Sequence, residues 1–235
     1  MVYGVILAGG VGSRMGGEKP KQYLTVKNKP IIIYTIEKFF TCPEFEKVIV
    51  LCPEQWVEHT KNLIKKYISP ALKKVVVIEG GSTRNETIMN AVDYIEAEGN
   101  LDKDTIIVTH DSVRPFVTHR IIEENISVCR KFGACDTVIS ATDTIVEAAN
   151  GKEISDIPDR SIMYQGQTPQ SFKAMKLKEV YNSLTEEEKN ILTDAAKILV
   201  LKGEKVALVA GETFNIKITY PYDLKIAKSL LEDEE

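Results

Sequence analysis

Apolar runs and helix-like patterns alternate along most of the chain. Tyr3–Ala8 is a continuous apolar run of the kind found in buried parallel strands. Further strands are predicted at Lys47–Cys52, Lys74–Ile78 and Thr105–Thr109, and helices at Pro30–Phe40, Glu54–Ile68, Arg84–Ala97 and Thr118–Lys131. This alternation predicts one α/β domain over residues 1–235, with a Rossmann-like, mostly parallel sheet flanked by helices.

The alternation stops between Ala141 and Gln170. Apolar and polar residues alternate there on both sides of Asn150-Gly151, a dipeptide that strongly favours a hairpin turn. We therefore predict a protruding β-hairpin arm at about residues 141–165. Because an isolated two-stranded hairpin is only marginally stable in water, we expect the arm to pack on a second subunit and form a homodimer.

Helical and strand patterns return after the arm. Thr185 opens a predicted helix, since TEEE has capping-box spacing, and this helix is expected to continue to Gly203. Lys205–Val209 reads as a strand, Asn215–Thr219 is short and β-branched, and Pro221 begins a last helix. Lys217 alternates with two isoleucines, so its ammonium faces either solvent or a ligand pocket.

The loop after the first strand is rich in glycine and in cations. It carries five glycines and three basic residues: Gly9, Gly10, Gly12, Gly16, Gly17, Arg14, Lys19 and Lys21. Glycine lets backbone N–H groups approach an anion closely, and the cations neutralise its charge. The loop therefore predicts a triphosphate site, and the alternative is a glycine-rich turn with solvated basic residues.

Two familiar phosphate-binding patterns do not fit this loop. No helix opens directly after the glycines, because Pro20 still lies ahead, and the second strand ends on Leu51-Cys52-Pro53 without a carboxylate. No Gly-Lys-Ser/Thr follows either. A nicotinamide dehydrogenase and a P-loop ATPase are both disfavoured.

Two further loops should meet the first, since ligands bind beyond the carboxyl ends of parallel strands. In Glu79–Thr87, Thr83 and Glu86 have capping-box spacing, while the remaining candidates serve either a turn or a nucleotide base and ribose. Those candidates are Gly80, Gly81, Arg84 and Thr87.

The third loop, His110–Phe116, places an aspartate directly after a buried strand. Asp111 is the candidate ligand for Mg²⁺, which takes one or two carboxylates besides water and substrate oxygens, and the alternative is a helix or turn cap. Arg114 lies close by and favours an anion site. His110 is a weaker candidate, because lone histidines are more often structural.

Composition narrows the class of protein. The chain has 235 residues, 43% of them hydrophobic, and a formal net charge of −4, which disfavours a general nucleic-acid or anionic-membrane binder. It has no long apolar run and no signal-peptide pattern, so we expect a cytoplasmic protein. The four cysteines lack CxxC spacing and are expected to be free, buried thiols.

Several motifs in order resemble the cytidylyltransferases that act on sugar or polyol phosphates. They are LAGGVGSRMG…PKQ, GGSTRNET, HDSVRPF, QTPQ and NIKIT…DL, and the resemblance spans essentially the whole chain. The acceptor is 2-C-methyl-D-erythritol 4-phosphate of isoprenoid synthesis in one branch and D-ribitol 5-phosphate of teichoic acid synthesis in the other. HDSVRPF, YQGQTPQ and LTDAAK resemble the ribitol branch: the methylerythritol enzymes more often have Ala-Ala after the HD aspartate and an acidic residue after TD.

The resemblance implies a role for each candidate residue. CTP would be bound by Leu7, Ala8, Gly9, Gly10, Gly12, Gly80, Gly81, Arg84, Thr87 and Ser112, and Mg²⁺ by Asp111. Arg14, Lys21 and Lys217 would be catalytic cations at the phosphates. Arg114 and Thr168 would contact the polyol phosphate, and Arg160 of the arm would enter the neighbouring subunit's site. A non-catalytic nucleotide-binding module is the rival class, although it has no reason to keep these charged residues together.

Overall fold

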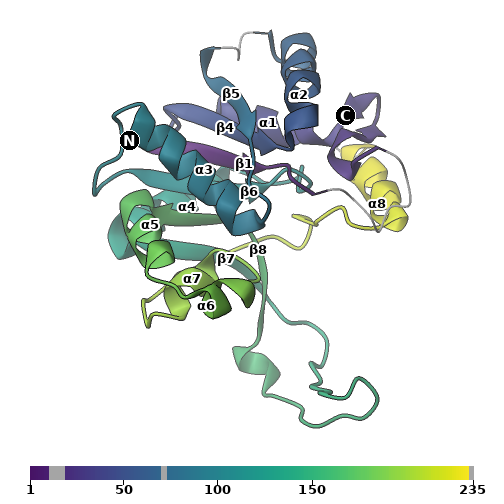
Figure 1. The fold of residues 1–235 in the computed structure, drawn as a ribbon. Helices are drawn as coiled ribbons and strands as arrows, with labels where there is room; N and C mark the ends of the chain where they lie inside the picture. The colour runs from purple at the N-terminus through teal and green to yellow at the C-terminus, as the bar shows by residue number, and fades with distance from the viewer. Residues whose placement is uncertain (11–18, 70–72, 233–235) are drawn as a thin grey trace.

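A computed structural model describes residues 1–10, 19–69 and 73–232 of the chain. These residues form a seven-stranded sheet in the order β5-β4-β1-β6-β8-β7-β9 (Figure 1). The strands are β1 (Val2–Leu7), β4 (Lys47–Cys52), β5 (Val75–Glu79), β6 (Ile106–Asp111), β7 (Ala134–Ser140), β8 (Tyr164–Lys173) and β9 (Ala207–Ala210). The first four run parallel, β8 is antiparallel to both of its neighbours, and β9 is parallel to β7. The predicted mostly parallel sheet is confirmed.

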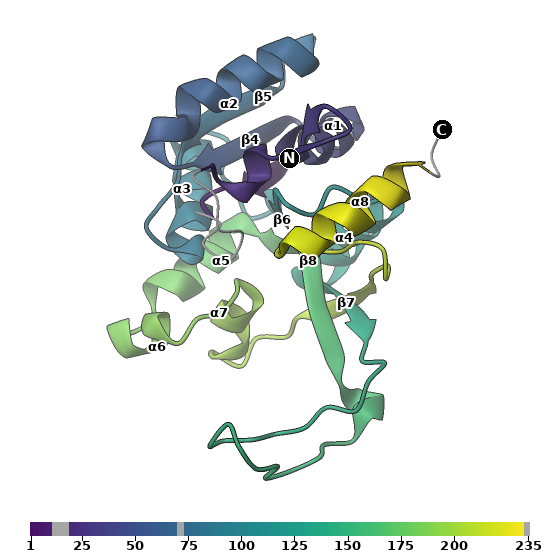
Figure 2. The same cartoon turned by 90° about the vertical axis from the view of Figure 1, so that its right-hand side faces the viewer.

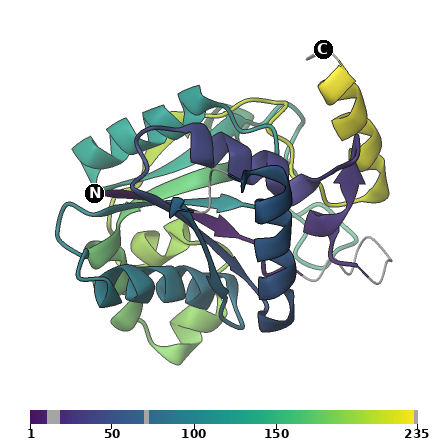
Figure 3. The same cartoon turned by 90° about the horizontal axis from the view of Figure 1, so that it is seen from above.

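Helices cover both faces of this sheet, as the view from above shows (Figure 3). One face packs against α1 (Ile31–Thr41), α2 (Glu54–Tyr67) and α4 (His119–Phe132). The other packs against α3 (Arg84–Ala97), α5 (Ala174–Asn182) and α7 (Ala196–Val200). Because both faces are covered, β1 and β4 are built almost entirely of buried apolar residues, and this explains the continuous runs in the sequence.

A smaller apolar cluster joins the last helix to the body of the domain. The short hairpin of β2 (Thr25–Val26) and β3 (Lys29–Pro30) packs with α8 (Pro221–Glu232). Val26 and Ile218 are buried in this cluster together with Val113, which follows β6. The cluster therefore brings the C-terminal segment beside the loop that follows β6.

The local signals in the sequence account for several element boundaries. Thr83 and Glu86 form the predicted capping box at the start of α3. Thr118 caps α4, and Gly133 ends that helix in the left-handed conformation at φ 87°. The α3 and β4 boundaries match the prediction residue for residue.

One predicted helix differs from the structure. The expected helix from Thr185 to Gly203 is two short helices, α6 (Glu186–Asn190) and α7. Asp194, just before α7, accepts a hydrogen bond from the Lys197 N–H in the first turn of that helix at 2.9 Å. The β-branched segment 215–219 forms no strand, and its Ile218 N–H donates instead to the Val113 carbonyl at 2.9 Å.

The predicted arm protrudes from the domain beyond β7 and β8 (Figure 2). Its turn forms as expected: Gly151 has φ 69°, and the Asn150 side chain accepts from the Lys152 and Glu153 N–H groups. The flanking strands do not form, since the Glu147–Asp156 bridge is isolated. The short 3-10 helix η4 (Arg160–Ile162) leads back into β8. Regular pairing is thus confined to the base of the arm, where β7 meets β8.

Among the described residues, no helix has the length and apolarity needed to cross a membrane. The four cysteines are free and buried, as predicted.

Candidate active site

The carboxyl ends of β1 and β6 open into one pocket. Leu7 lies opposite Asp111 in the parallel register, and the Ser112 N–H donates to the Leu7 carbonyl at 3.0 Å. The cavity has a volume of about 370 Å³, within the range of small-molecule sites. Its lining comes from all three predicted loops and from the C-terminal segment: Leu7, Gly9, Gly10, Lys21, Gln22, Gly81, Ser82, Thr83, Arg84, Thr87, Asp111, Ser112, Val113, Lys217 and Thr219.

The described part of the glycine loop leaves its backbone accessible. A Cβ atom added at Gly9 or Gly10 would meet no atom within 4 Å, so the loop faces open space there. Gln22 holds the start of the loop in place, since its Nε2 donates to the Ala8 carbonyl at 2.7 Å. Lys21, in the short 3-10 helix η2 (Lys21–Tyr23), is buried at the pocket wall with 8% of its surface exposed. Gly12 and Arg14 lie outside the described residues.

The second loop is held tightly against the start of α3. A Cβ atom at Gly81 would clash with the Glu86 side chain and would lie 2.8 Å from the Glu86 carbonyl carbon. The Gly81 N–H donates to the Thr87 hydroxyl at 3.0 Å. Glycine is therefore needed at position 81 for a close approach, and the turn and ligand roles left open by the sequence are compatible at this residue.

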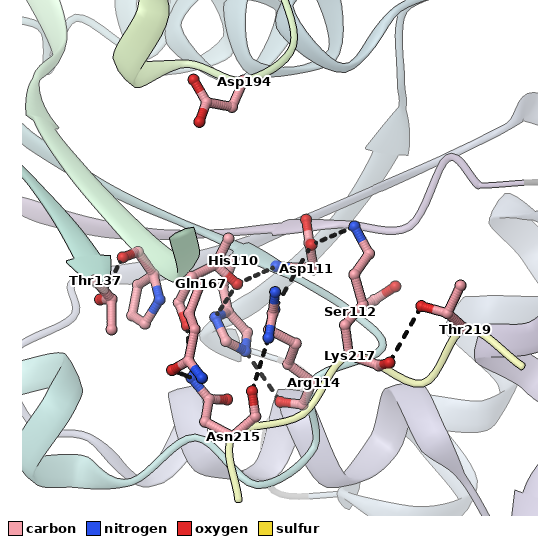
Figure 4. A network of polar contacts seen from close by, with 12 residues as sticks. His110, Asp111, Ser112, Arg114, Thr137, Gln167, Asp194, Asn215, Lys217 and Thr219 are labelled. Carbon is pink, nitrogen blue, oxygen red and sulfur yellow. Dashed lines mark hydrogen bonds and ion pairs between the residues drawn. The ribbon is translucent and has the colours of Figure 1, made fainter. Parts of the chain in front are cut away.

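Asp111 is the electrostatic centre of the site. Its carboxylate lies 2.8 Å from Lys217 Nζ and 3.9 Å from Arg114 Nε (Figure 4). It also lies 3.2 Å from Arg84 Nη2. Burial alone would raise the pKa of Asp111, but these cations outweigh burial and hold the pKa well below its usual range. The carboxylate is therefore charged at neutral pH.

A buried hydrogen-bond chain supports Asp111 from behind. The Asp111 N–H donates to the Thr168 hydroxyl at 3.2 Å, and Thr168 Oγ1 lies 2.9 Å from His110 Nδ1. His110 Nε2 lies 3.0 Å from the Arg114 carbonyl, an acceptor, which places the ring proton on Nε2. Burial lowers the pKa of His110 to about 4, so the ring is neutral and positions its neighbours.

Lys217, the cation that pairs most closely with Asp111, comes from the C-terminal segment. Arg114 donates from Nη1 to the Asn215 carbonyl at 2.7 Å, and the Asn215 amide donates to the Thr168 carbonyl at 2.9 Å. These bonds, with the one from Ile218 to Val113, fix the backbone on both sides of Lys217. The sequence left open whether the Lys217 side chain faces solvent or a ligand pocket, and in the structure Lys217 lines the pocket.

The structure brings most of the predicted residues together. Ten line the pocket: Leu7, Gly9, Gly10, Lys21, Gly81, Arg84, Thr87, Asp111, Ser112 and Lys217. Ala8, Gly80, Arg114 and Thr168 do not line it, and the last two lie in the network behind Asp111. Arg160 lies in the arm, exposed, and donates to the Thr142 carbonyl at 2.8 Å.

Sequence reasoning assigned no ligand role to five residues of the lining: Gln22, Ser82, Thr83, Val113 and Thr219. Each lies next to or within a motif that the prediction used, so proximity to those motifs was the available signal. The spacing predicts Thr83 only as a helix cap, and the structure shows it in that position and in the pocket lining as well.

The donor set at Asp111 fits a magnesium ion only together with a phosphate ligand. The described residues contain no group of three or more His, Cys, Asp or Glu side chains able to enclose a metal. Asp111 is a single ionised carboxylate at the pocket wall, and Mg²⁺ is commonly held by one or two carboxylates plus substrate phosphates and water. The residues therefore suit an ion that arrives with a nucleotide.

Comparison with known proteins gives a consistent match. The family model of 2-C-methyl-D-erythritol 4-phosphate cytidylyltransferase, IspD, matches residues 2–233. The 4-diphosphocytidyl-2C-methyl-D-erythritol synthase of Anaerococcus prevotii shares the fold with a TM-score of 0.80 at 24% identity, covering 99% of this chain and 96% of its own. The 2-C-methyl-D-erythritol 4-phosphate cytidylyltransferase of Francisella tularensis has a TM-score of 0.80 at 26% identity, over 97% and 98% of the two chains. That of Thermus thermophilus has a TM-score of 0.74 at 27% identity, over 99% and 100%.

Proposed function

The chain belongs to the IspD family and is therefore a CTP-dependent cytidylyltransferase, and we propose that its acceptor is D-ribitol 5-phosphate. The products would be CDP-ribitol, a precursor for teichoic acid, and pyrophosphate. The observation that carries the proposed roles is the convergence of Lys21, Arg84 and Lys217 on a pocket beside the Asp111 carboxylate.

The residue types suit transfer between phosphates. An oxygen of the acceptor phosphate would form the new bond to the α-phosphorus of CTP, while the bond to the bridging oxygen of the β-phosphate breaks and pyrophosphate departs. The attacking phosphate is already anionic near neutral pH and needs no strong base. The protein therefore contributes mainly positioning and charge neutralisation.

Three cations of the pocket would each neutralise charge on a different part of the substrates. Lys21 beside the glycine loop would hold the triphosphate and stabilise charge on the leaving pyrophosphate. Lys217 pairs with Asp111, but 42% of its side chain is exposed, so its ammonium would also contact the phosphates. Arg84, anchored on Asp111 at the start of α3, would meet the nucleotide from the second loop.

We propose Asp111 as the protein ligand of a catalytic Mg²⁺. The ion would neutralise phosphate charge and help hold the triphosphate in line for attack. The low pKa of Asp111 supports this role, because a carboxylate that stays ionised is available to a cation throughout the neutral range.

The choice of acceptor rests on three stretches of sequence. HDSVRPF, YQGQTPQ and LTDAAK all resemble the ribitol branch. Ser112 of the first stretch is buried at the pocket wall, where the methylerythritol branch more often has alanine. The family model and the names of the similar structures favour 2-C-methyl-D-erythritol 4-phosphate, which is therefore the second candidate acceptor.

A direct assay separates these acceptors. Pyrophosphate release would be measured with CTP and Mg²⁺, using D-ribitol 5-phosphate and 2-C-methyl-D-erythritol 4-phosphate at matched concentrations. We expect a higher kcat/KM with the ribitol substrate and loss of release when EDTA removes the metal. A higher kcat/KM with the methylerythritol substrate would refute the proposed acceptor, and release that persists in EDTA would refute the metal role.

We also propose that the arm forms a homodimer interface. Its exposed apolar side chains support this: Val146, Ile154, Ile157, Ile162 and Tyr164 are each at least 48% exposed. Such a surface is stable in water mainly when another surface covers it. Light scattering at micromolar concentration should give twice the mass of the chain, and the mass of one chain would overturn the proposal.

A further inference from the structure

Lys217 lies on a segment that has no regular secondary structure. The chain leaves β9 at Ala210 and enters α8 at Pro221, and the residues between them form neither helix nor strand. The Lys217 ammonium nevertheless lies 2.8 Å from Asp111 Oδ2. Because a lysine side chain is long and flexible, its position depends on how firmly the backbone beneath it is held. The contacts that hold this segment therefore bear on the active site.

The Gln167 side chain, from β8, holds the segment upstream of Lys217. Its Nε2 donates to the Glu212 carbonyl at 2.8 Å, and its Oε1 accepts from Asn215 Nδ2 at 3.1 Å. Figure 4 shows the amide groups of Gln167 and Asn215 pointing toward each other. The Asn215 N–H also donates to the Glu212 carbonyl at 3.0 Å, which closes a turn. One buried amide group thus binds this turn at both of its ends.

Gly211 leaves room for the Gln167 amide group. A Cβ atom added at Gly211 would clash with Gln167 Oε1, and it would lie 3.0 Å from Thr137 Cγ2. The Gly211 N–H donates to the Val138 carbonyl at 2.8 Å, so the backbone at this glycine is tied to β7. A side chain at position 211 would therefore displace the Gln167 amide group from its partners.

The backbone of Lys217 is held from two sides. Upstream, Asn215 is bonded to Gln167, and it is fully buried. Downstream, the Ile218 N–H donates to the Val113 carbonyl at 2.9 Å. Without the upstream contact, only the downstream one would limit the backbone next to Lys217. The ammonium would then sample positions away from the pocket.

We propose that Gln167 is a positioning residue for Lys217. By binding the Glu212 carbonyl and the Asn215 amide, it fixes the turn that directs the Lys217 ammonium toward Asp111 and the phosphates. Gln167 does not line the pocket, so it acts through Lys217 and not by touching substrate. The inference rests on the proposed function, since it presupposes the catalytic role of Lys217.

Two other roles for Gln167 make different predictions. Gln167 could support Arg114, which donates from Nη1 to the Asn215 carbonyl at 2.7 Å, or it could contribute only to stability. An effect through Arg114 would persist after Lys217 is removed. A contribution to stability alone would lower the unfolding temperature and leave the kcat of the folded enzyme unchanged.

The test is a double-mutant cycle of Gln167→Ala and Lys217→Ala. Pyrophosphate release is measured with CTP, Mg²⁺ and whichever acceptor gives the wild-type protein the higher kcat/KM. We expect Gln167→Ala to lower kcat about tenfold to a hundredfold, because a small misplacement of a catalytic group has an effect of this size. When Lys217 is already alanine, Gln167→Ala should lower kcat by less than about twofold, since the group that it positions is absent.

A second variant disturbs the same contact without changing Gln167. Gly211→Ala should lower kcat in the wild-type background, because its methyl group displaces the Gln167 amide. It should likewise have little effect when Lys217 is alanine. Gln55 is exposed on α2, so Gln55→Ala is the matched control and should leave kcat unchanged. Thermal unfolding reports whether each variant is folded.

The outcomes separate this inference from the function on which it rests. If Lys217→Ala lowers kcat and Gln167→Ala keeps the wild-type value, the inference is wrong. It is also wrong if Gln167→Ala lowers kcat by the same factor with and without Lys217. If Gln167→Ala does not fold, Gly211→Ala decides by the same comparison. If Lys217→Ala keeps the wild-type kcat, or if the wild-type protein releases no pyrophosphate with either acceptor, the proposed function itself fails.

Discussion

Replacing Lys21 with alanine is expected to lower kcat about a hundredfold to a thousandfold. Lys21 is 8% exposed at the pocket wall, and the neighbouring Gln22 donates to the Ala8 carbonyl, so Lys21 is positioned next to the glycine loop before substrate arrives. Removal of one preorganised group that stabilises developing negative charge typically costs two to three orders of magnitude. Initial rates of pyrophosphate release at saturating CTP measure the effect.

A surface lysine provides the control for this variant. Lys61 is exposed on α2 and forms a surface ion pair with Glu58 at 2.7 Å, a kind of contact that contributes little, so Lys61→Ala should change kcat little. Calorimetric titration with CTP should show that Lys21→Ala still binds nucleotide, because the loop glycines and Arg84 remain. A Lys21→Ala variant with near-wild-type kcat would remove Lys21 from the catalytic cations.

Asp111→Asn is expected to reduce kcat/KM by a similar hundredfold to thousandfold. The substitution keeps the shape of the side chain but removes the charge that holds Arg84, Arg114 and Lys217 together. It also removes the proposed metal ligand, so the Mg²⁺ concentration needed for half-maximal rate should rise. Rates measured across a series of Mg²⁺ concentrations test both effects.

The pH dependence of this loss follows from the pKa of Asp111. Because the folded pKa is depressed, the charged carboxylate contributes stability above its unfolded pKa of about 3.9, and that contribution is lost only as pH falls through the lower folded value. The ratio of wild-type to Asp111→Asn activity should therefore stay constant from about pH 6 to pH 9. A ratio that titrates in this window would contradict the assigned charge state.

A surface aspartate controls for the loss of a carboxylate in general. Asp104 is 70% exposed and pairs with Lys173 at 3.0 Å, far from the pocket lining. Asp104→Asn should leave the rate and its Mg²⁺ dependence unchanged. Equal activity of Asp111→Asn and Asp104→Asn would show that Asp111 has no role in the reaction.

The βα winding could be predicted because its signals are local. A strand such as Lys47–Cys52 is buried on both faces and reads as an unbroken apolar run. The start of α3 is set by the Thr83–Glu86 capping box, whose two members are three residues apart. The positions of the loops then followed from the parallel sheet, and with them Asp111 beside Leu7.

The features that could not be predicted depend on contacts between distant residues. The break before α7 involves Asp194, which accepts hydrogen bonds from the Lys197 N–H and from the distant Gln170 amide, and the sequence around it remains helical in pattern. The direction of Lys217 depends on the bond from Ile218 to Val113.

The pocket residues come from distant parts of the sequence, and this determines when the site can form during protein synthesis. The glycine loop and Lys21 leave the ribosome before Lys217, which emerges only after every strand of the described sheet has been made. A nascent or prematurely terminated chain can fold much of its sheet, yet its carboxylate at Asp111 lacks the Lys217 ammonium opposite it. If Lys217 has the proposed role, a chain that stops before this residue would be inactive toward CTP.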